Sequence, residues 1–244
     1  MKITFLGTSH GIPAKDRFCT ALLVESGEKL YLIDAGAPIL EWFYKKEIPY
    51  EAMKGIFISH AHSDHIGGLY SYLTRTNHRS KEASFPIYLP HPDLLELLPR
   101  FIEITDLYPY DAERLPLRLA KEGVAYEDQA IRISYIQNEH IPYSYCILLE
   151  GEGKKVLFSG DLSGGLKKKD FPAIALQEPL DAIICEMAHF DAEDIKLYLE
   201  QINVKQFWFT HINRPEEKIP KIKALQGKYP YPIHIAEDED EILL

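Results

Sequence analysis

Short apolar runs recur along the chain, and their length and their β-branched or aromatic content predict β-strands. The runs lie at residues 3–6, 20–24, 30–33, 55–58, 131–136, 145–149, 156–158, 182–185, 207–210 and 233–236. Two of the breaks between runs are short and polar: the one between Glu28 and Lys29, and the stretch "GEGKK" at 151–155. Both breaks predict hairpins.

Helical patterns separate most of the other runs. They cover residues 37–46, 93–107, 192–202 and 215–228, and a further helix is expected to begin after Gly67 and Gly68. The strand runs fall into two clusters, each flanked by helices, which predicts two sheets packed face to face with helices outside. We expect residues 1–244 to form a single α/β domain, because 244 residues with 46% hydrophobic content can bury one substantial core.

The segment from residue 70 to residue 120 is unusually rich in Pro, Tyr and Leu, as in "FPIYLPHPDLLELLPRFIEITDLYPY". One interpretation is a helical cover whose aromatic side chains help to shape a pocket, and the other is ordinary amphipathic packing. The sequence leaves both open. The acidic run "EDEDE" at 237–241 is interpreted as a solvated end of the chain.

Charge and composition exclude several classes of function. The net charge is −10, from 37 acidic and 27 basic residues, which argues against an extended groove for nucleic acid. The first residues are too briefly apolar for a signal peptide, and no run approaches a membrane-spanning length. Cys19, Cys146 and Cys185 are far apart within apolar runs, so they are expected to be buried thiols. A cytoplasmic protein without membrane contact is expected.

The stretch "FISHAHSDHIGGL" at 57–69 concentrates metal-binding side chains directly after a predicted strand. His60 and His62 alternate along an extended segment, so their rings project to the same side and can bind one cation. Asp64 and His65 fall in the next turn and point to a second position a few ångströms away. The alternative, a polar loop that happens to be rich in histidine, fits this spacing poorly.

Two cations need more ligands than one turn supplies, and the ends of later strands offer them. His140 follows one predicted strand, Asp161 ends "KVLFSGD", and His211 ends "QFWFTH". A carboxylate can bridge two cations, so Asp161 is the expected shared ligand. The expected sets are His60, His62, His140 and Asp161 for one metal, and Asp64, His65, His211 and Asp161 for the other.

The turn "HAHSDH" resembles the signature of the metallo-β-lactamase superfamily. This resemblance implies a four-layer αββα sandwich with a dinuclear site at one edge of the two sheets. "MKITFLGTSHGIP" and "LYLIDAG" are similar to the opening hairpins of that superfamily. "EHIPYSYCI" and "CEMAHF" resemble the branch that contains ribonuclease Z and cyclic phosphodiesterases.

The ligand types weaken other branches of the superfamily. Relatives that hydrolyse antibiotics commonly use a cysteine in the second site, and redox di-iron relatives carry an acidic residue where His62 stands. A nitrogen-rich set with a bridging carboxylate favours two zinc ions, although manganese or iron also fit. The implied function is a metal-dependent phosphodiesterase that attacks a small or cyclic phosphodiester with a metal-bridging hydroxide.

Three side chains are candidates for catalysis. His189 in "EMAHFDAED" lies where the resemblance places a histidine that serves as general acid. Glu186 either orients that imidazole or points to solvent. Asp64 is a candidate for assisting the nucleophile, although metal binding is its first expected role. His10 in "GTSHGIP" either points into the pocket or caps a turn.

The resemblance to ribonuclease Z fails at one point. The long arm by which ribonuclease Z clamps transfer RNA is inserted between the third histidine and the bridging aspartate, but here strands and the turn "GEGKK" fill the stretch from His140 to Asp161. Transfer RNA is therefore an unexpected partner. Two alternatives remain: an ester, lactone or thioester hydrolase with Tyr143 or Tyr145 as oxyanion donor, and a non-catalytic metal-dependent binding protein. The oligomeric state is left open, a homodimer being one candidate.

Overall fold

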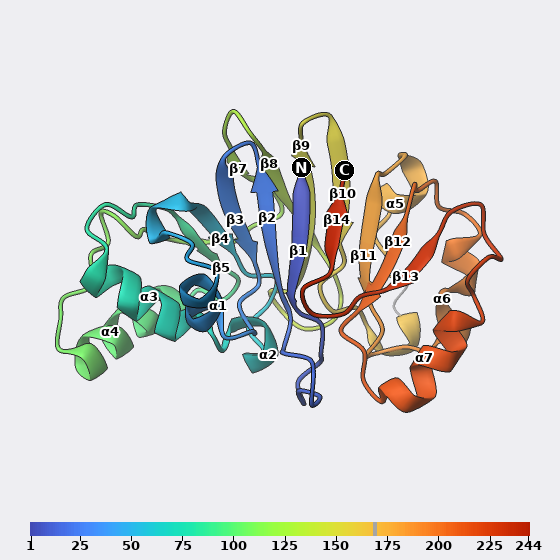
Figure 1. Cartoon of the computed structure of the whole chain (residues 1–244), viewed down its shortest axis with the longest axis horizontal. Coiled ribbons are helices and arrows are strands. Elements are labelled where there is room, and N and C mark those ends of the chain that lie inside the picture. Colours follow the sequence, from blue (N-terminus) through green and yellow to red (C-terminus); the bar gives the residue numbers. More distant parts are fainter. Residues whose placement is uncertain (168–169) are drawn as a thin grey trace.

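Two seven-stranded β-sheets face each other in the computed structural model, which describes residues 1–167 and 170–244 (Figure 1). The first sheet has the order β14-β1-β2-β3-β4-β5-β6 and the second β13-β12-β11-β10-β9-β8-β7. The strands of the first sheet are β14 (Glu241–Leu243), β1 (Lys2–Gly7), β2 (Ala21–Ser26), β3 (Lys29–Ile33), β4 (Met53–Phe57), β5 (Ile87–Leu89) and β6 (Leu117–Leu119). Those of the second are β13 (Ile233–Ile235), β12 (Phe207–Thr210), β11 (Ala182–Glu186), β10 (Lys154–Phe158), β9 (Tyr145–Gly151), β8 (Arg132–Gln137) and β7 (Gly123–Glu127).

Helices cover the outer face of each sheet (Figure 1). On the first sheet these are α1 (Ile39–Lys45), α3 (Leu69–Arg79) and α4 (Leu94–Asp106), and on the second they are α5 (Ile174–Gln177), α6 (Ala192–Leu199) and α7 (Pro215–Lys223). The short α2 (Ser63–Ile66) lies at one edge of the sandwich, and the 3₁₀ turns are η1 (Tyr50–Ala52) and η2 (Gly164–Leu166). The structure thus confirms the predicted αββα sandwich.

Alternation along the strands explains these layers. In β3, Tyr31 and Ile33 enter the core between the sheets, whereas Leu32 packs into the core beneath the helices. Side chains of a strand point alternately to its two faces, so a strand with apolar residues at successive positions can serve two cores. In the second sheet, Leu157 of β10 likewise packs outward into the core that contains Ile195 of α6.

The predicted strands all form, and both predicted hairpins join antiparallel neighbours. Four strands were missed: β5, β6, β7 and β14. Residues 70–120 hold α3 and α4 as expected, but the two short strands β5 and β6 lie among them and extend the first sheet. α3 packs on α1 at the outer face of that sheet, so this part of the segment performs ordinary packing.

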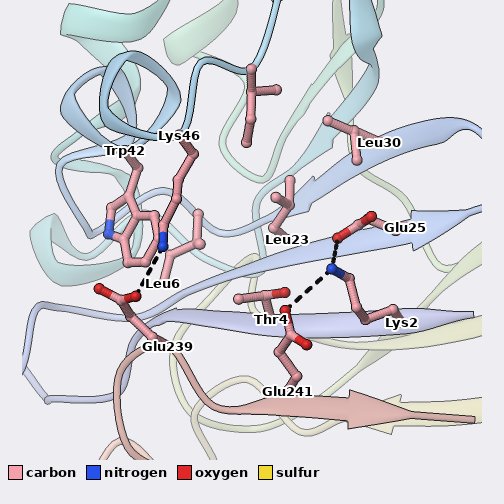
Figure 2. Close-up of a pocket in the computed structure, with 11 residues that line it drawn as sticks. Lys2, Thr4, Leu6, Leu23, Glu25, Leu30, Trp42, Lys46, Glu239 and Glu241 are labelled. Atoms are coloured by element: carbon pink, nitrogen blue, oxygen red, sulfur yellow. Dashed lines mark hydrogen bonds and ion pairs between the residues drawn. The ribbon is translucent and has the colours of Figure 1, made fainter.

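The acidic run at 237–241 is exposed at Glu237, Glu239 and Glu241, as expected of a solvated end, but it is also attached to the first sheet. Asp238 accepts hydrogen bonds from the Thr8 hydroxyl at 2.6 Å and from the Phe18 amide at 2.7 Å. Glu239 pairs with Lys46 at 3.0 Å, and Glu241 begins β14 beside β1. Glu239 and Glu241 line a hollow of about 390 Å³ beside β1 and β2. Figure 2 shows their side chains, with Glu239 paired to Lys46 and Glu241 paired to Lys2. Many of the carboxylates serve to attach the end of the chain to the first sheet.

Within the described part of the chain, no helix is long and apolar enough to cross a bilayer.

Candidate metal centre

One edge of the sandwich collects the ends of strands from both sheets. β3 and β4 run parallel in the first sheet, and β10, β11 and β12 run parallel in the second, so their carboxyl ends emerge together. Asp34 follows β3, His60 follows β4, Asp161 follows β10 and His211 follows β12. His140 follows β8, which runs antiparallel to β9 and therefore ends at the same edge.

The turn that carries His60 to His65 is packed tightly against the loop after β3. The Ala35 amide donates to the carbonyl of His65, and the Gly68 amide donates to the carbonyl of Ala35, both at 2.7 Å. A Cβ on Gly36 would lie 1.7 Å from the Asp64 carbonyl oxygen, and one on Gly68 would lie 2.0 Å from that of Ala37. Only glycine permits this close approach at Gly36 and Gly68.

Four of the predicted ligands surround a first point. His62 Nδ1 lies 3.1 Å from His60 Nε2 and 3.3 Å from His140 Nε2. Asp161 Oδ2 lies 3.5 Å from His60 Nε2 and 3.7 Å from His140 Nε2. One ligand atom from each of these four residues lies within 4.8 Å of the others. This is the first set expected from the sequence.

The second set surrounds a neighbouring point. His65 Nε2 and His211 Nε2 each lie 3.8 Å from Asp64 Oδ2. Asp161 Oδ1 lies 3.3 Å from His65 Nε2, and its Oδ2 lies 3.4 Å from His211 Nε2. Asp161 therefore lies between the two groups. The structure brings all seven predicted ligand residues together.

The donor atoms in both groups fit divalent cations. Two ligands bound to one tetrahedral zinc at about 2.0–2.1 Å lie about 3.3 Å from each other, which is close to the observed spacings. His65 Nε2 and Asp161 Oδ1 are buried and make no hydrogen bond of good geometry with the residues that the structure describes. Buried polar atoms normally have partners, so these two indicate a group that completes the site.

The ionisation of the cluster also suits cations. Burial, together with the neighbouring His65, lowers the pKa of His60, and burial lowers the pKa of His140. Neutral imidazole is the form that binds metals. Burial disfavours the charged forms of both His65 and Asp161. Even so, Asp161 and Asp34 raise the pKa of His65, and His211 and His65 hold the pKa of Asp161 well below its ordinary value. The pocket therefore stabilises positive charge beside an ionised Asp161.

Three further residues hold the ligands in orientation, and sequence reasoning missed them. Asp34 Oδ2 accepts a hydrogen bond from His65 Nδ1 at 2.7 Å. Thr20 Oγ1 lies 2.7 Å from His211 Nδ1, and Ser59 Oγ lies 3.1 Å from His60 Nδ1. Partners of this kind fix the ring and direct the other nitrogen at the metal. The position of Asp34 at the end of an apolar run, in "LYLIDAG", was the signal that could have found it.

His189 reaches the same site from the loop after β11. Its Nδ1 donates to Glu186 Oε1 at 2.9 Å and lies 3.8 Å from Asp161 Oδ2. Burial opposes protonation, but the hydrogen bond and charge of Glu186 raise the pKa of His189 overall. Glu186 is buried and also accepts the amides of Leu162, Ala188 and His189. Glu186 therefore orients His189 and does not point to solvent.

Other candidates lie around or away from this cluster. The His10 ring lies edge-on to His211 with centroids 6.3 Å apart, so His10 borders the site. Tyr143 is exposed and lies edge-on to His91, at the start of the segment that leads into α4. Tyr145 is buried between the sheets and its hydroxyl donates to the Ala120 carbonyl, so the interpretation of Tyr145 as an oxyanion donor is wrong.

The cysteines are free thiols, as expected: Cys146 and Cys185 are buried and Cys19 is half-buried. From His140 to Asp161 the chain forms only β9, its turn and β10, without a projecting arm.

Comparison with curated proteins identifies relatives of this arrangement. The chain is 30% identical over 151 residues to ribonuclease Z of Trichodesmium erythraeum, covering 59% of this chain and 46% of that protein. It is 34% identical over 138 residues to ribonuclease Z of Synechocystis sp., covering 54% of this chain and 41% of that protein. The match thus spans less than half the length of these relatives.

Solved structures share the whole fold at low identity. The metallo-β-lactamase fold protein YhfI of Bacillus subtilis superposes with a TM-score of 0.77, 18% identity and 99% coverage of both chains. The short form of human tRNase Z superposes with a TM-score of 0.75 at 20% identity, covering 100% of this chain and 99% of that one. Zn²⁺-bound PqqB of Methylobacterium extorquens gives 0.72 with 14% identity and full coverage of both.

The family match covers the opening hairpins, the His60–His65 turn, His140 and Asp161. Residues 1–183 match the family described as anti-Pycsar protein Apyc1. With the fold and relatives above, the chain belongs to this family, in the ribonuclease Z-like branch of the metallo-β-lactamase superfamily.

Proposed function

We propose that the protein is a metal-dependent hydrolase that cleaves small or cyclic phosphodiesters. The observation that carries this proposal is the position of Asp161, whose carboxylate lies 3.3–3.8 Å from ring nitrogens of His60, His65, His140, His189 and His211. A carboxylate between two groups of donor atoms suits a dinuclear hydrolytic site, because its two oxygens can bind two cations.

In this proposal one ion is held by His60, His62, His140 and Asp161, and the other by Asp64, His65, His211 and Asp161. Zinc is the preferred ion because five of the seven ligand residues offer imidazole nitrogen, and manganese or iron remain compatible. The similarity to the Zn²⁺-bound PqqB supports this choice at the level of the fold. A bound pair of ions would supply a polarised phosphoryl group and an acidified water.

The residues of the chain would supply orientation and a proton. Glu186 holds His189 Nδ1, which leaves Nε2 to face a substrate. A raised pKa keeps the imidazole of His189 protonated closer to neutrality, so it can donate to the leaving oxygen. Asp64 is half-buried between His65 and His211, which favours its role as a ligand over direct action on the nucleophile.

The substrate class follows from the surroundings of the site. The net charge of −10 and the short β9–β10 connection offer few contacts to the phosphates of a long RNA. A small phosphodiester needs only the cluster and its rim. For the alternative of a carboxylic ester, Tyr145 is excluded as an oxyanion donor by its bond to the Ala120 carbonyl, which leaves Tyr143.

The test combines elemental analysis with turnover assays. We expect about two divalent ions per chain, hydrolysis of bis(p-nitrophenyl) phosphate, and loss of that activity with chelator. A panel of cyclic nucleotides, cyclic sugar phosphates, nucleic acids and lactones would then identify the substrate class. Full activity in metal-free protein, or turnover of lactones without any phosphodiester, would contradict the proposal.

A further inference from the structure

Lys218 of α7 is a buried lysine whose ammonium hydrogen-bonds to one loop only. Lys218 is 3% exposed, and its Nζ donates to the carbonyl oxygens of Met187 at 2.7 Å, Phe190 at 2.8 Å and Ala188 at 3.0 Å. An ammonium group has three hydrogens, so these three bonds use its whole donor capacity. All three acceptors flank His189.

All four backbone carbonyls of the loop 187–190, and two of its amides, are hydrogen-bonded. The carbonyl that Lys218 does not reach, that of His189, accepts the Gly165 amide at 2.8 Å. The amides of Ala188 and His189 donate to Glu186 Oε2 at 2.7 and 2.9 Å. Glu186 therefore holds the loop by its N–H groups, and Lys218 holds it by its carbonyls.

Burying an ammonium is costly, and a hydrophobic side chain of similar size would often be neutral or stabilising at such a place. The position of Lys218 in the chain suggests why the cost is accepted. α7 begins shortly after His211, so the same segment of chain carries a proposed metal ligand and the ammonium that grips the His189 loop. Lys218 thereby attaches the loop that carries His189 to the helix that follows the proposed ligand His211.

We propose that Lys218 is a positioning residue that holds the loop 187–190 so that His189 can deliver its proton to the leaving group. This inference rests on the proposed function, in which His189 is the proton donor. It adds that the donor works at its full rate only when a buried ammonium from α7 fixes the backbone of the loop that carries it.

The test compares Lys218→Met with Lys223→Met, which removes an exposed lysine from the same helix. Two substrates separate positioning from general damage. p-Nitrophenolate leaves bis(p-nitrophenyl) phosphate without needing a proton, whereas opening a cyclic phosphodiester releases an alkoxide that does need one. Metal content and melting temperature are measured for every variant.

We expect His189→Ala to slow the cyclic substrate by about 10²–10⁴-fold, mainly in kcat, and the nitrophenyl substrate far less. Lys218→Met should show the same selectivity with a loss of about 10- to 100-fold, because small misplacements of a catalytic group are costly. The double variant should be no slower than His189→Ala alone, since both changes remove one function. Lys223→Met should resemble the wild type.

Amide hydrogen exchange tests the inference without using activity. In Lys218→Met the amides of residues 187–190 should exchange faster than in the wild type or Lys223→Met, while β11 stays protected. Lys218→Gln, which carries two donor hydrogens on a shorter side chain, should be intermediate and serves if the Met variant does not fold. Unchanged exchange in the loop, equal slowing of both substrates, or multiplied losses in the double variant would overturn the role of Lys218. No effect of His189→Ala would instead refute the proposed proton donor.

Discussion

Asp161 and Asp128 are two shielded carboxylates at opposite ends of the sandwich, and their surroundings differ in kind. Asp128 lies between β7 and β8, where Lys29, Tyr31 and Tyr126 donate to its Oδ2 and the amides of Ala130 and Ile131 donate to its Oδ1. Asp161 instead faces ring nitrogens at 3.3 Å or more, and within residues 1–167 and 170–244 its Oδ1 has no hydrogen-bond partner.

β3 connects the two regions. Lys29 at its start binds Asp128, and Asp34 directly after its end binds His65. The polar atoms of the first region are paired with one another, whereas the second leaves His65 Nε2 and Asp161 Oδ1 unpaired among the described residues. This difference is the one expected if Asp128 contributes to folding and Asp161 to the proposed metal site. Variants of the two regions should therefore fail in different ways.

The largest effect is expected for Asp161→Ala. Both proposed sites lose the carboxylate they share, so the variant should lose at least one metal and all measurable hydrolysis. Elemental analysis and phosphodiesterase assays check this, with circular dichroism to establish folding. Retention of both metals and of activity would show that Asp161 is not the shared ligand.

His189→Ala should rank second. The variant should keep both metals and lose about 10²–10⁴-fold in turnover when the leaving group is poor. Glu186 raises the pKa of His189 above the ordinary histidine value of about 6.5, although burial opposes this. Because the acid form is the active one, wild-type activity should fall as pH rises through that raised pKa. That limb of the pH profile should be absent from His189→Ala. Its survival there would assign the proton donor elsewhere.

How much of this site the sequence predicts depends on how local each signal is. The ligands were found because each lies in the turn "HAHSDH" or follows an apolar run, so one residue and its neighbours carry the information. Asp34, Thr20 and Lys218 act on residues far along the chain, at 65, 211 and 187–190, and no spacing within their own segments reveals those pairs. Their roles appear only when the two sheets and α7 are assembled.

Short length contributes to three of the four missed strands. β5, β6 and β14 have three residues each, a length at which an alternating pattern is weak, although the equally short β13 was predicted. β14 also begins inside an acidic run, and only its pairing with β1 gives that run a structural role. Longer apolar strands such as β9 and β11 were predicted because burial on both faces marks them in the sequence itself.

Asp34→Asn should have a smaller effect than either change at the site. It removes the charge that holds His65 Nδ1–H but keeps an amide oxygen at the same place. Loss of such a partner typically weakens metal binding about 10- to 100-fold, which chelator competition can measure. Thr20→Val, a matched variant without a charge change, should weaken binding less. Equal metal affinity in Asp34→Asn and wild type would mean that His65 needs no orienting carboxylate.

Asp128→Asn should leave activity unchanged and lower only stability. The amide oxygen can still accept from Ala130 and Ile131, but an NH₂ group would face Lys29 and the two tyrosines. We expect the free energy of unfolding at pH 7 to fall by about 1–3 kcal/mol, measured by urea denaturation.

The pH dependence of that loss identifies its cause. Burial alone would raise the pKa of Asp128, but Lys29, the Ala130 amide and Tyr31 overcome it and lower the pKa. A carboxylate with a depressed folded pKa stabilises the protein above its unfolded pKa of about 3.9, and this contribution is lost as pH falls toward the folded value. The difference between wild type and Asp128→Asn should thus be constant from pH 7 to 5 and shrink below about pH 4. A difference that does not change with pH would mean that the shape of the side chain, and not its charge, stabilises this end of the sandwich.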